Sequence, residues 1–179
     1  NKKIYKYCKE YHDHGHELNP KFSRGMDTKT ITGFNYRMTE LQAAIGKVQL
    51  KKLDYIISEN KKRYIALFNE IKKTKLIFRL IPKNTIQIFD TLIVRCEDKK
   101  IRKKIVKLLN ATGFGTKNLP DAIKWHCAYF WDHALNFNQV SKLNKTKLDL
   151  EKSIAIPIWL KKTKLNYQEL GKKIANLIL

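Results

Sequence analysis

The chain has 179 residues, of which 43% are hydrophobic. This length allows one sizeable domain, and this composition argues against an intrinsically disordered protein. It carries a formal charge of +21, but the lysines are scattered and there is no arginine-rich arm, so a solvated basic exterior is favoured over a dedicated nucleic-acid surface. No apolar run reaches membrane-spanning length and no signal peptide opens the sequence, so we expect no membrane association.

The first part of the chain predicts a short helix and a long loop that lead into a long helix. Apolar residues recur at helical spacing over 2–12 and predict a helix there. Residues 13–32 are rich in His, Gly, Pro, Ser and Thr and predict a loop of a length that is usually functional. Thr39 followed by Gln42 is a capping-box signature. Apolar residues then continue over 39–73, as one long helix or a kinked pair.

The second half predicts a small α+β domain in which helices cover a few-stranded sheet. Pro157 favours an edge or strand-end position for the last strand. The expected elements are strands over 76–81 and 85–96, a helix over 101–110, a short strand over 113–119, an irregular aromatic-rich stretch over 120–138, a helix over about 139–152, a strand over 153–159 and a helix over 167–179.

Cysteine and histidine spacing argues against metal and nucleophile chemistry. Cys8, Cys96 and Cys127 are far apart and in no CxxC spacing, which indicates a reducing, cytoplasmic compartment without a disulfide framework. Residues 12–17 hold three imidazoles and two carboxylates, but their spacing fits no common metal motif, so we expect a pocket loop and no metal. Cys127 adjoins His126, yet sequence neighbours rarely form a nucleophile–base pair, so Cys127 is predicted to be core.

A polar turn, Asn35-Tyr36-Arg37-Met38, stands directly before the predicted helix start. Helix starts favour anions because free backbone N–H groups and the helix dipole both point there. The guanidinium of Arg37 suits a carboxylate or phosphate, and the amide of Asn35 can donate to a phosphate oxygen. On residue types alone, a simple surface turn is favoured over an anion site.

The block that contains this turn closely resembles the DegT/StrS-type sugar aminotransferases, which use pyridoxal 5′-phosphate (PLP). It runs Gly33-x-Asn35-Tyr36-Arg37-Met38-x-Glu40-Leu41-Gln42-Ala43-Ala44-Ile45-Gly46-x-x-Gln49-Leu50-x-x-Leu53. Asp13-His14-Gly15 is similar to the family's upstream "HG" element, and Gly113-Phe114-Gly115-Thr116 and the region of His126 look like its small-domain segment. The resemblance covers essentially the whole chain.

The resemblance implies an α/β protein, the C-terminal part of PLP-dependent transferase fold type I. Residues 1–38 would end the large cofactor-binding domain and carry an active-site loop. Residues 39–73 would form a long connecting helix, and residues 74–179 the small α+β domain. The family forms homodimers with shared active sites, so the chain is expected to act beside a partner subunit.

Roles carried over by position concern the cofactor and the substrate pocket. Asn35 would reach across the dimer interface to the PLP phosphate of the partner, and Arg37 would add positive charge beside it. His126 would face the substrate pocket from the small domain. Further pocket candidates are His14, His16 and Tyr36.

The lysine that forms a Schiff base with PLP in this family would lie upstream of Asn1, so no catalytic residue is assigned within the chain. A Schiff-base lysine must be desolvated, and no lysine here stands in a comparable context, which makes a surface role the expectation for each. The sequence does not begin with methionine. We therefore expect a fragment or processed product that completes an active site and is inactive alone.

The resemblance implies transfer of an amino group, from glutamate, to a keto-sugar, a keto-sugar acid or a nucleotide-linked sugar in surface polysaccharide biosynthesis. Residues 118–122, 125–126 and 131–133 are similar to a subgroup that acts on 8-amino-3,8-dideoxy-manno-octulosonate. Two alternatives remain open: a basic nucleic-acid-binding module, which the charge alone supports, and a non-catalytic family member or truncated product.

Overall fold

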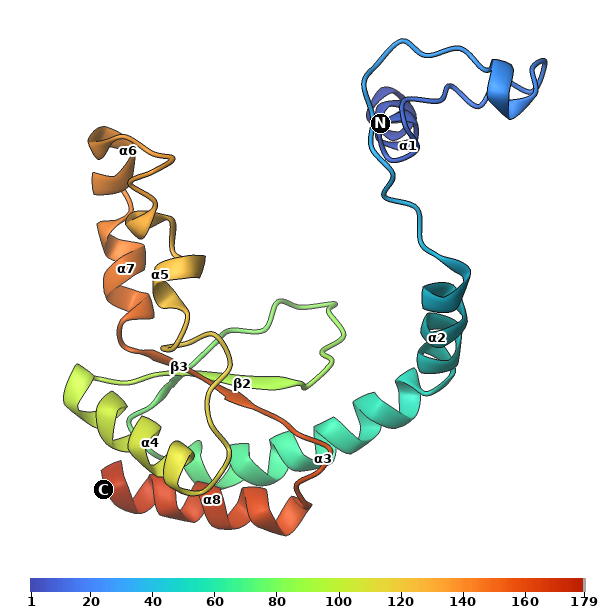
Figure 1. Cartoon of the computed structure of the whole chain (residues 1–179). Coiled ribbons are helices and arrows are strands. Elements are labelled where there is room, and N and C mark those ends of the chain that lie inside the picture. The colour runs from blue at the N-terminus through green and yellow to red at the C-terminus, as the bar shows by residue number, and fades with distance from the viewer. Residues whose placement is uncertain (179) are drawn as a thin grey trace. The chain divides into compact units, whose positions relative to one another are not determined.

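The computed structural model describes residues 1–178, which belong to two compact units (Figure 1). We call Asn1–Lys52 the N-terminal unit and Leu53–Leu179 the C-terminal unit, and describe each by itself. The N-terminal unit contains α1 (Lys2–Tyr11), the 3-10 turn η1 (Arg24–Met26) and α2 (Glu40–Lys51). No helix within residues 1–178 combines the length and apolar character needed to cross a bilayer.

Both α-helices of the N-terminal unit begin at side-chain caps. The Asn1 side chain accepts from the Lys3 N–H at 3.0 Å and starts α1. The predicted capping box of α2 is confirmed: the Thr39 hydroxyl accepts from the Gln42 N–H at 3.3 Å, and the Gln42 side chain accepts from the Thr39 N–H at 2.9 Å. Reciprocal caps of this kind satisfy two otherwise unpaired donors. The helix start directly after the Asn-Tyr-Arg-Met turn is therefore fixed locally.

The C-terminal unit is built around a three-stranded antiparallel sheet of order β1-β2-β3. Val94 of β2 pairs with Phe78 on one side and with Ile154 on the other. The elements are α3 (Leu53–Ile71), β1 (Ile77–Phe78), β2 (Thr91–Arg95), α4 (Lys99–Ala111), α5 (Ile123–His126), the 3-10 turn η2 (Ala128–Phe130), α6 (Phe137–Ser141), α7 (Asn144–Leu150), β3 (Ser153–Pro157) and α8 (Lys164–Ile178).

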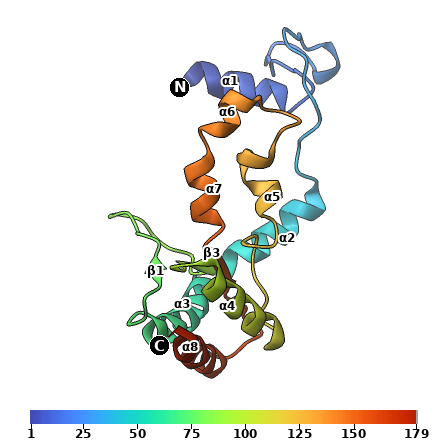
Figure 2. The same ribbon diagram turned by 90° about the vertical axis from the view of Figure 1, so that its left-hand side faces the viewer.

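The core of this unit lies between the sheet and the helices α3, α4 and α8, which lie on one side of it (Figures 1 and 2). Side chains with no solvent exposure come from each layer, among them Leu67, Val94, Ile105 and Ile156. The buried Tyr167 hydroxyl joins α8 to the end of β3, since it donates to the Pro157 carbonyl at 3.0 Å and accepts from the Trp159 N–H. Burial raises the pKa of Tyr167 to about 12.

The helix expected over 39–73 is a pair, because α2 ends at Lys51 and α3 begins at Leu53. At Lys52 the N–H donates to the carbonyls of Gln49 and Leu50, a tightened last turn that closes α2. Pro157 lies at the end of β3, which is an edge strand, as predicted. The prediction that Cys127 is buried is also confirmed.

Several strand and helix predictions were wrong in extent. The strands expected over 76–81 and 85–96 pair only as β1 and β2, and the segment between them exposes Leu80 and Ile86 by 91% and 90%. The strand expected over 113–119 does not form. Positive φ angles at Gly113, Gly115 and Asn118 interrupt the extended backbone, leaving an isolated bridge between Lys117 and Leu119. The helix expected over 139–152 is divided into α6 and α7.

Candidate functional site

The Asn-Tyr-Arg-Met turn is held against the end of α1 by the backbone. The N–H of Phe34 donates to the Tyr11 carbonyl at 2.8 Å, and the N–H of Tyr36 donates to the His12 carbonyl at 2.9 Å. Between these bonds, Asp13 and Asn35 form an antiparallel bridge. The register brings the segment with the His-rich motif alongside the turn, as two short strands of a sheet would lie.

Close backbone contact at Gly15 fixes the other side of this arrangement. Gly15 is buried and has a φ of +81°, a conformation that favours glycine. A Cβ added there would stand 2.0 Å from the Ile31 carbonyl oxygen, and one added to Gly33 would stand 2.3 Å from the Gly15 nitrogen. The two glycines therefore let the His-Gly element and the start of the Asn-Tyr-Arg-Met block approach backbone to backbone.

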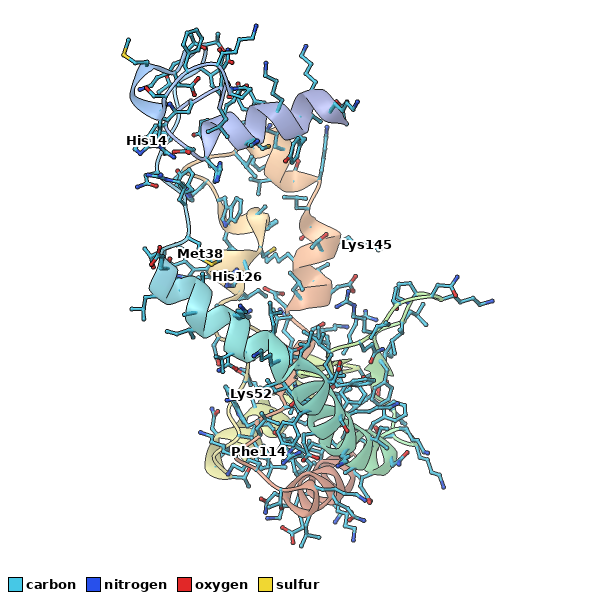
Figure 3. The ribbon with its side chains drawn as sticks, turned by 90° about the vertical axis from the view of Figure 1, so that its right-hand side faces the viewer. His14, Met38, Lys52, Phe114, His126 and Lys145 are labelled. Carbon is cyan, nitrogen blue, oxygen red and sulfur yellow. The ribbon has the colours of Figure 1, made fainter. Side chains whose placement is uncertain are left out.

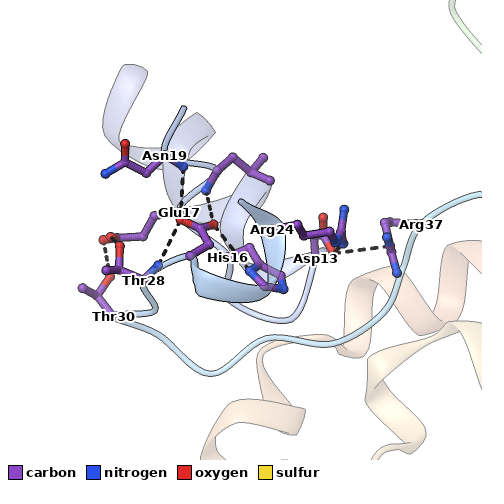
Figure 4. Close-up of polar contacts among 10 residues, drawn as sticks. Asp13, His16, Glu17, Asn19, Arg24, Thr28, Thr30 and Arg37 are labelled. Carbon is purple, nitrogen blue, oxygen red and sulfur yellow. Dashed lines mark hydrogen bonds and ion pairs between the residues drawn. The ribbon is translucent and has the colours of Figure 1, made fainter. Parts of the chain in front are cut away.

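A buried carboxylate organises the charged side chains of the turn (Figure 4). Asp13 is 4% exposed, and its Oδ1 lies 2.5 Å from Arg24 Nη2 and 3.3 Å from Arg37 Nε. Arg37 Nε also donates to Asn35 Oδ1 at 3.1 Å. In the sequence, Asp13 is one of the acids of the His-rich segment, and its contact with Arg37 was not predicted. The only signal was the position of Asp13 beside His14-Gly15.

These contacts leave donors free on the exposed side of the turn. The side-chain oxygen of Asn35 is occupied by Arg37, and among the described residues its NH2 group makes no hydrogen bond. The Arg37 side chain is 41% exposed, so its remaining N–H groups reach solvent. The free amide NH2 of Asn35 and the guanidinium N–H groups of Arg37 that face away from Asp13 suit an anion with several oxygen atoms, such as a phosphate.

Two carboxylates, those of Glu17 and Asp27, hold the loop over residues 18–30 together. The Asp27 carboxylate accepts three backbone N–H groups, and its Oδ2 lies 3.4 Å from His16 Nδ1. Burial raises the pKa of Asp27, but these donors and His16 outweigh it, so the pKa lies below its usual range. The N–H donors belong to Leu18, Asn19 and Thr28, and the Glu17 carboxylate in turn accepts from the hydroxyls of Thr28 and Thr30.

The pocket candidates of the N-terminal unit differ in whether their side chains are exposed or held in contacts with the protein. His16 is 13% exposed on its side chain and faces Asp27, so it supports the loop. His14 is exposed, with a φ of 56°, and its N–H donates to the Phe34 carbonyl at 3.0 Å (Figure 3). Tyr36 is 64% exposed and packs with Tyr11 and Phe34 in an aromatic cluster. His14 and Tyr36 are therefore the two with accessible side chains.

His126 belongs to the C-terminal unit, where it ends the short helix α5 and is exposed (Figure 3). Its N–H donates to the Ala122 carbonyl at 3.0 Å. The helix is followed by the buried Cys127 and is tied to η2 by Trp131, whose indole N–H donates to the Trp125 carbonyl at 3.0 Å. The local backbone thus presents the imidazole of His126 to solvent beside an exposed Trp125.

Residues 1–178 contain no buried lysine and no group of three His, Cys, Asp or Glu side chains able to hold a metal ion. A lysine amine becomes a good nucleophile near neutral pH when it is desolvated or lies beside another cation. The part of the chain that the structure describes therefore offers donors for an anion but no desolvated lysine.

The chain belongs to the DegT/DnrJ/EryC1/StrS aminotransferase family, whose family model matches residues 1–174. Solved structures with the same fold include 3-amino-5-hydroxybenzoic acid (AHBA) synthase, with a TM-score of 0.72 and 16% sequence identity over 99% of this chain. The putative sugar aminotransferase Spr1654 from Streptococcus pneumoniae, in its PMP form, has a TM-score of 0.68 and 16% sequence identity over 99% of this chain. Helicobacter pylori PseC, an aminotransferase involved in the biosynthesis of pseudoaminic acid, has a TM-score of 0.69 and 15% sequence identity over 99% of this chain.

The expected fold class is confirmed by these structures. The present chain covers 47%, 46% and 47% of the three structures, so it spans about half of their length. At such low identity the likeness concerns the fold.

Proposed function

We propose that this chain supplies the C-terminal part of a PLP-dependent aminotransferase that transfers an amino group to a keto-sugar or keto-sugar acid. Membership of the family supports the reaction class. The observation that carries the proposal for this chain is the exposed Asn35–Arg37 pair, held from behind by the buried Asp13. Residues 1–38 would complete the large domain, 39–73 would connect, and 74–179 would form the small domain.

The donors of the turn fit the phosphate of PLP. The NH2 group of Asn35 would donate to a phosphate oxygen, and Arg37 would offset its charge, while Asp13 keeps the guanidinium in place. When bound, PLP supplies an electron sink for amino-group transfer. The lysine that holds the cofactor would come from outside residues 1–179. In a homodimer, the Asn35–Arg37 pair would serve the cofactor of the partner subunit.

Substrate recognition would fall to exposed side chains of both units. We propose His126, His14 and Tyr36 as groups that face the sugar, with His16 holding the loop that follows His14. Imidazole and phenol groups can both donate and accept hydrogen bonds, which suits sugar hydroxyls. Glutamate is the proposed amino donor, and the product would enter surface polysaccharide biosynthesis, with the 8-amino-3,8-dideoxy-manno-octulosonate class as one candidate.

The test joins this chain to the lysine-bearing half of the enzyme, fused or co-expressed, and compares wild type with an Asn35→Ala, Arg37→Ala variant. Removing two charge-assisted contacts to a phosphate is expected to weaken PLP retention by about 100-fold. Retention is measured by the absorbance of bound cofactor after dialysis, and transamination by keto-acid formation from glutamate.

The matched control is Asn69→Ala, Arg79→Ala, which removes one exposed Asn and one exposed Arg from the C-terminal unit. It is expected to keep the wild-type cofactor content. If the Asn35, Arg37 variant retains PLP and turns over as wild type does, the assignment of the phosphate site is wrong.

A further inference from the structure

Helix α4 carries an unusual concentration of positive charge. Its thirteen residues include six basic side chains and no acidic one. The six are Lys99, Lys100, Arg102, Lys103, Lys104 and Lys107. The opposite face of the helix holds Ile105 and Leu109, which have no solvent exposure, so the helix is anchored in the core. Its five lysines are exposed, whereas Arg102 is partly buried.

This charge pattern works against the stability of the helix. Lys99, Lys103 and Lys107 follow one another at four-residue spacing, as do Lys100 and Lys104, and like charges at this spacing repel. Several of them lie in the first turns, where the helix dipole disfavours cations. Among the described residues, Lys99 alone of the six forms an ion pair, with Glu151 at 2.5 Å. The arrangement is thus not explained by local folding.

One side of α4 also forms a groove of about 330 Å³, at the lower end of the range of roughly 300–1,000 Å³ for small-molecule sites. It is lined by Arg102, Lys103, Val106, Lys107, Asn110 and Pro120. Three of these are cations and none is an acid. Arg102 Nε is buried and has no hydrogen-bond partner among the described residues. Glu151, whose carboxylate feels the charge of Arg102, is already bonded to Lys99.

We propose that this groove binds a phosphate-bearing anion of one or two phosphate groups. A guanidinium, two ammonium groups and an amide supply many donors, and three positive charges match a phosphate or diphosphate better than a singly charged carboxylate. Val106 and Pro120 add a small apolar wall. None of these residues takes part in the aminotransferase site proposed above, so the two proposals stand independently.

Two sources could present this chemistry: a free phosphorylated metabolite or the headgroup of an anionic phospholipid. Inorganic pyrophosphate, titrated by calorimetry, tests the first. Cosedimentation with phosphatidylcholine vesicles, with and without phosphatidic acid, tests the second. Both use the whole chain, with circular dichroism and thermal unfolding recorded for every variant.

The test variant is Arg102→Gln, Lys103→Gln, Lys107→Gln, and a milder one is Lys103→Gln, Lys107→Gln. The control removes the same charge from exposed lysines elsewhere in the C-terminal unit: Lys73→Gln, Lys164→Gln, Lys172→Gln. The groove variant is expected to bind at least about 30-fold more weakly than wild type, because charge-assisted contacts are lost. The control is expected to change affinity no more than about twofold, since its charges lie outside the groove.

Saturable pyrophosphate binding with this pattern supports a metabolite site, and vesicle binding alone with this pattern supports a headgroup site. Equal losses in the groove and control variants would mean that only the overall charge of the chain attracts anions, and the proposal would fail. It would also fail if the folded wild type bound neither probe.

Discussion

Replacing Asp13 by Asn tests whether one carboxylate organises the Asn-Tyr-Arg-Met turn. The substitution keeps the shape but removes the charge shared by Arg24 and Arg37. A hydrogen bond to a charged group contributes roughly 1.5–3 kcal/mol. The two arginine side chains are 52% and 41% exposed, so water replaces part of each contact. Discounting for that exposure, we expect a loss of about 2 kcal/mol in the local opening free energy of the turn.

Hydrogen exchange monitored by mass spectrometry measures this directly, since the amides of Phe34 and Tyr36 are bonded across the affected segment. A loss of about 2 kcal/mol corresponds to roughly 30-fold faster exchange there, with the amides of β2 and β3 unchanged. Asp132→Asn, an exposed carboxylate in the C-terminal unit, is the matched control. Unchanged exchange around the turn in the Asp13 variant would refute the role given to this carboxylate.

Three further predictions concern the rest of the fold. Gly15→Ala places a Cβ 2.0 Å from the Ile31 carbonyl oxygen at a residue with positive φ, so amide exchange across the turn is expected to become faster by a factor of about 30 or more. The control Gly25→Ala meets no atom within 4 Å and is expected to leave the exchange rate unchanged. Thr39→Ala removes the N-cap of α2 and is expected to lower the stability of that helix by about 1 kcal/mol, which would be measured as faster amide exchange in α2. The control Thr32→Ala changes an exposed threonine outside the helix and is expected to leave exchange in α2 unchanged. Folding keeps the proton on Tyr167, whose pKa rises from 10.0 to about 12, so the free energy of unfolding should fall by up to about 2.7 kcal/mol as pH rises across that window. Tyr167→Phe should abolish that pH-dependent part in denaturant titrations; an identical slope in the variant would contradict it.

Local signals in the sequence predicted the helix starts well and the strands poorly. The Thr39–Gln42 cap depends only on residues three apart, and it forms as expected. Strand formation depends on a pairing partner that a single segment does not reveal. The apolar residues between β1 and β2, such as Leu80 and Ile86, have β-forming character but remain unpaired and exposed.

The candidate site was predictable in part for the same reason. The Asn35–Arg37 pair could be found because its residues are two positions apart and belong to a specific family motif. The support from Asp13 could not be found in the same way, because its contacts with Arg24 and Arg37 join residues 11 or more positions apart beside the backbone bridge between Asp13 and Asn35. Gly15 and Gly33 let the two backbone segments lie in close contact, and the need for glycine at these positions is seen only in the structure.

The sharing of Asp13 between two arginines has an electrostatic consequence for an anion site. A carboxylate paired with Arg37 alone would cancel its charge and remove the long-range attraction for a phosphate. With Arg24 bound to the same oxygen, the cluster keeps one net positive charge while Arg37 stays oriented. Arg37 is also bonded to Asn35 Oδ1, so the donors that remain free on both side chains face outward from a fixed base. The turn therefore keeps the Arg37 side chain oriented and still attracts a phosphate, whereas a single ion pair would orient Arg37 but cancel its charge.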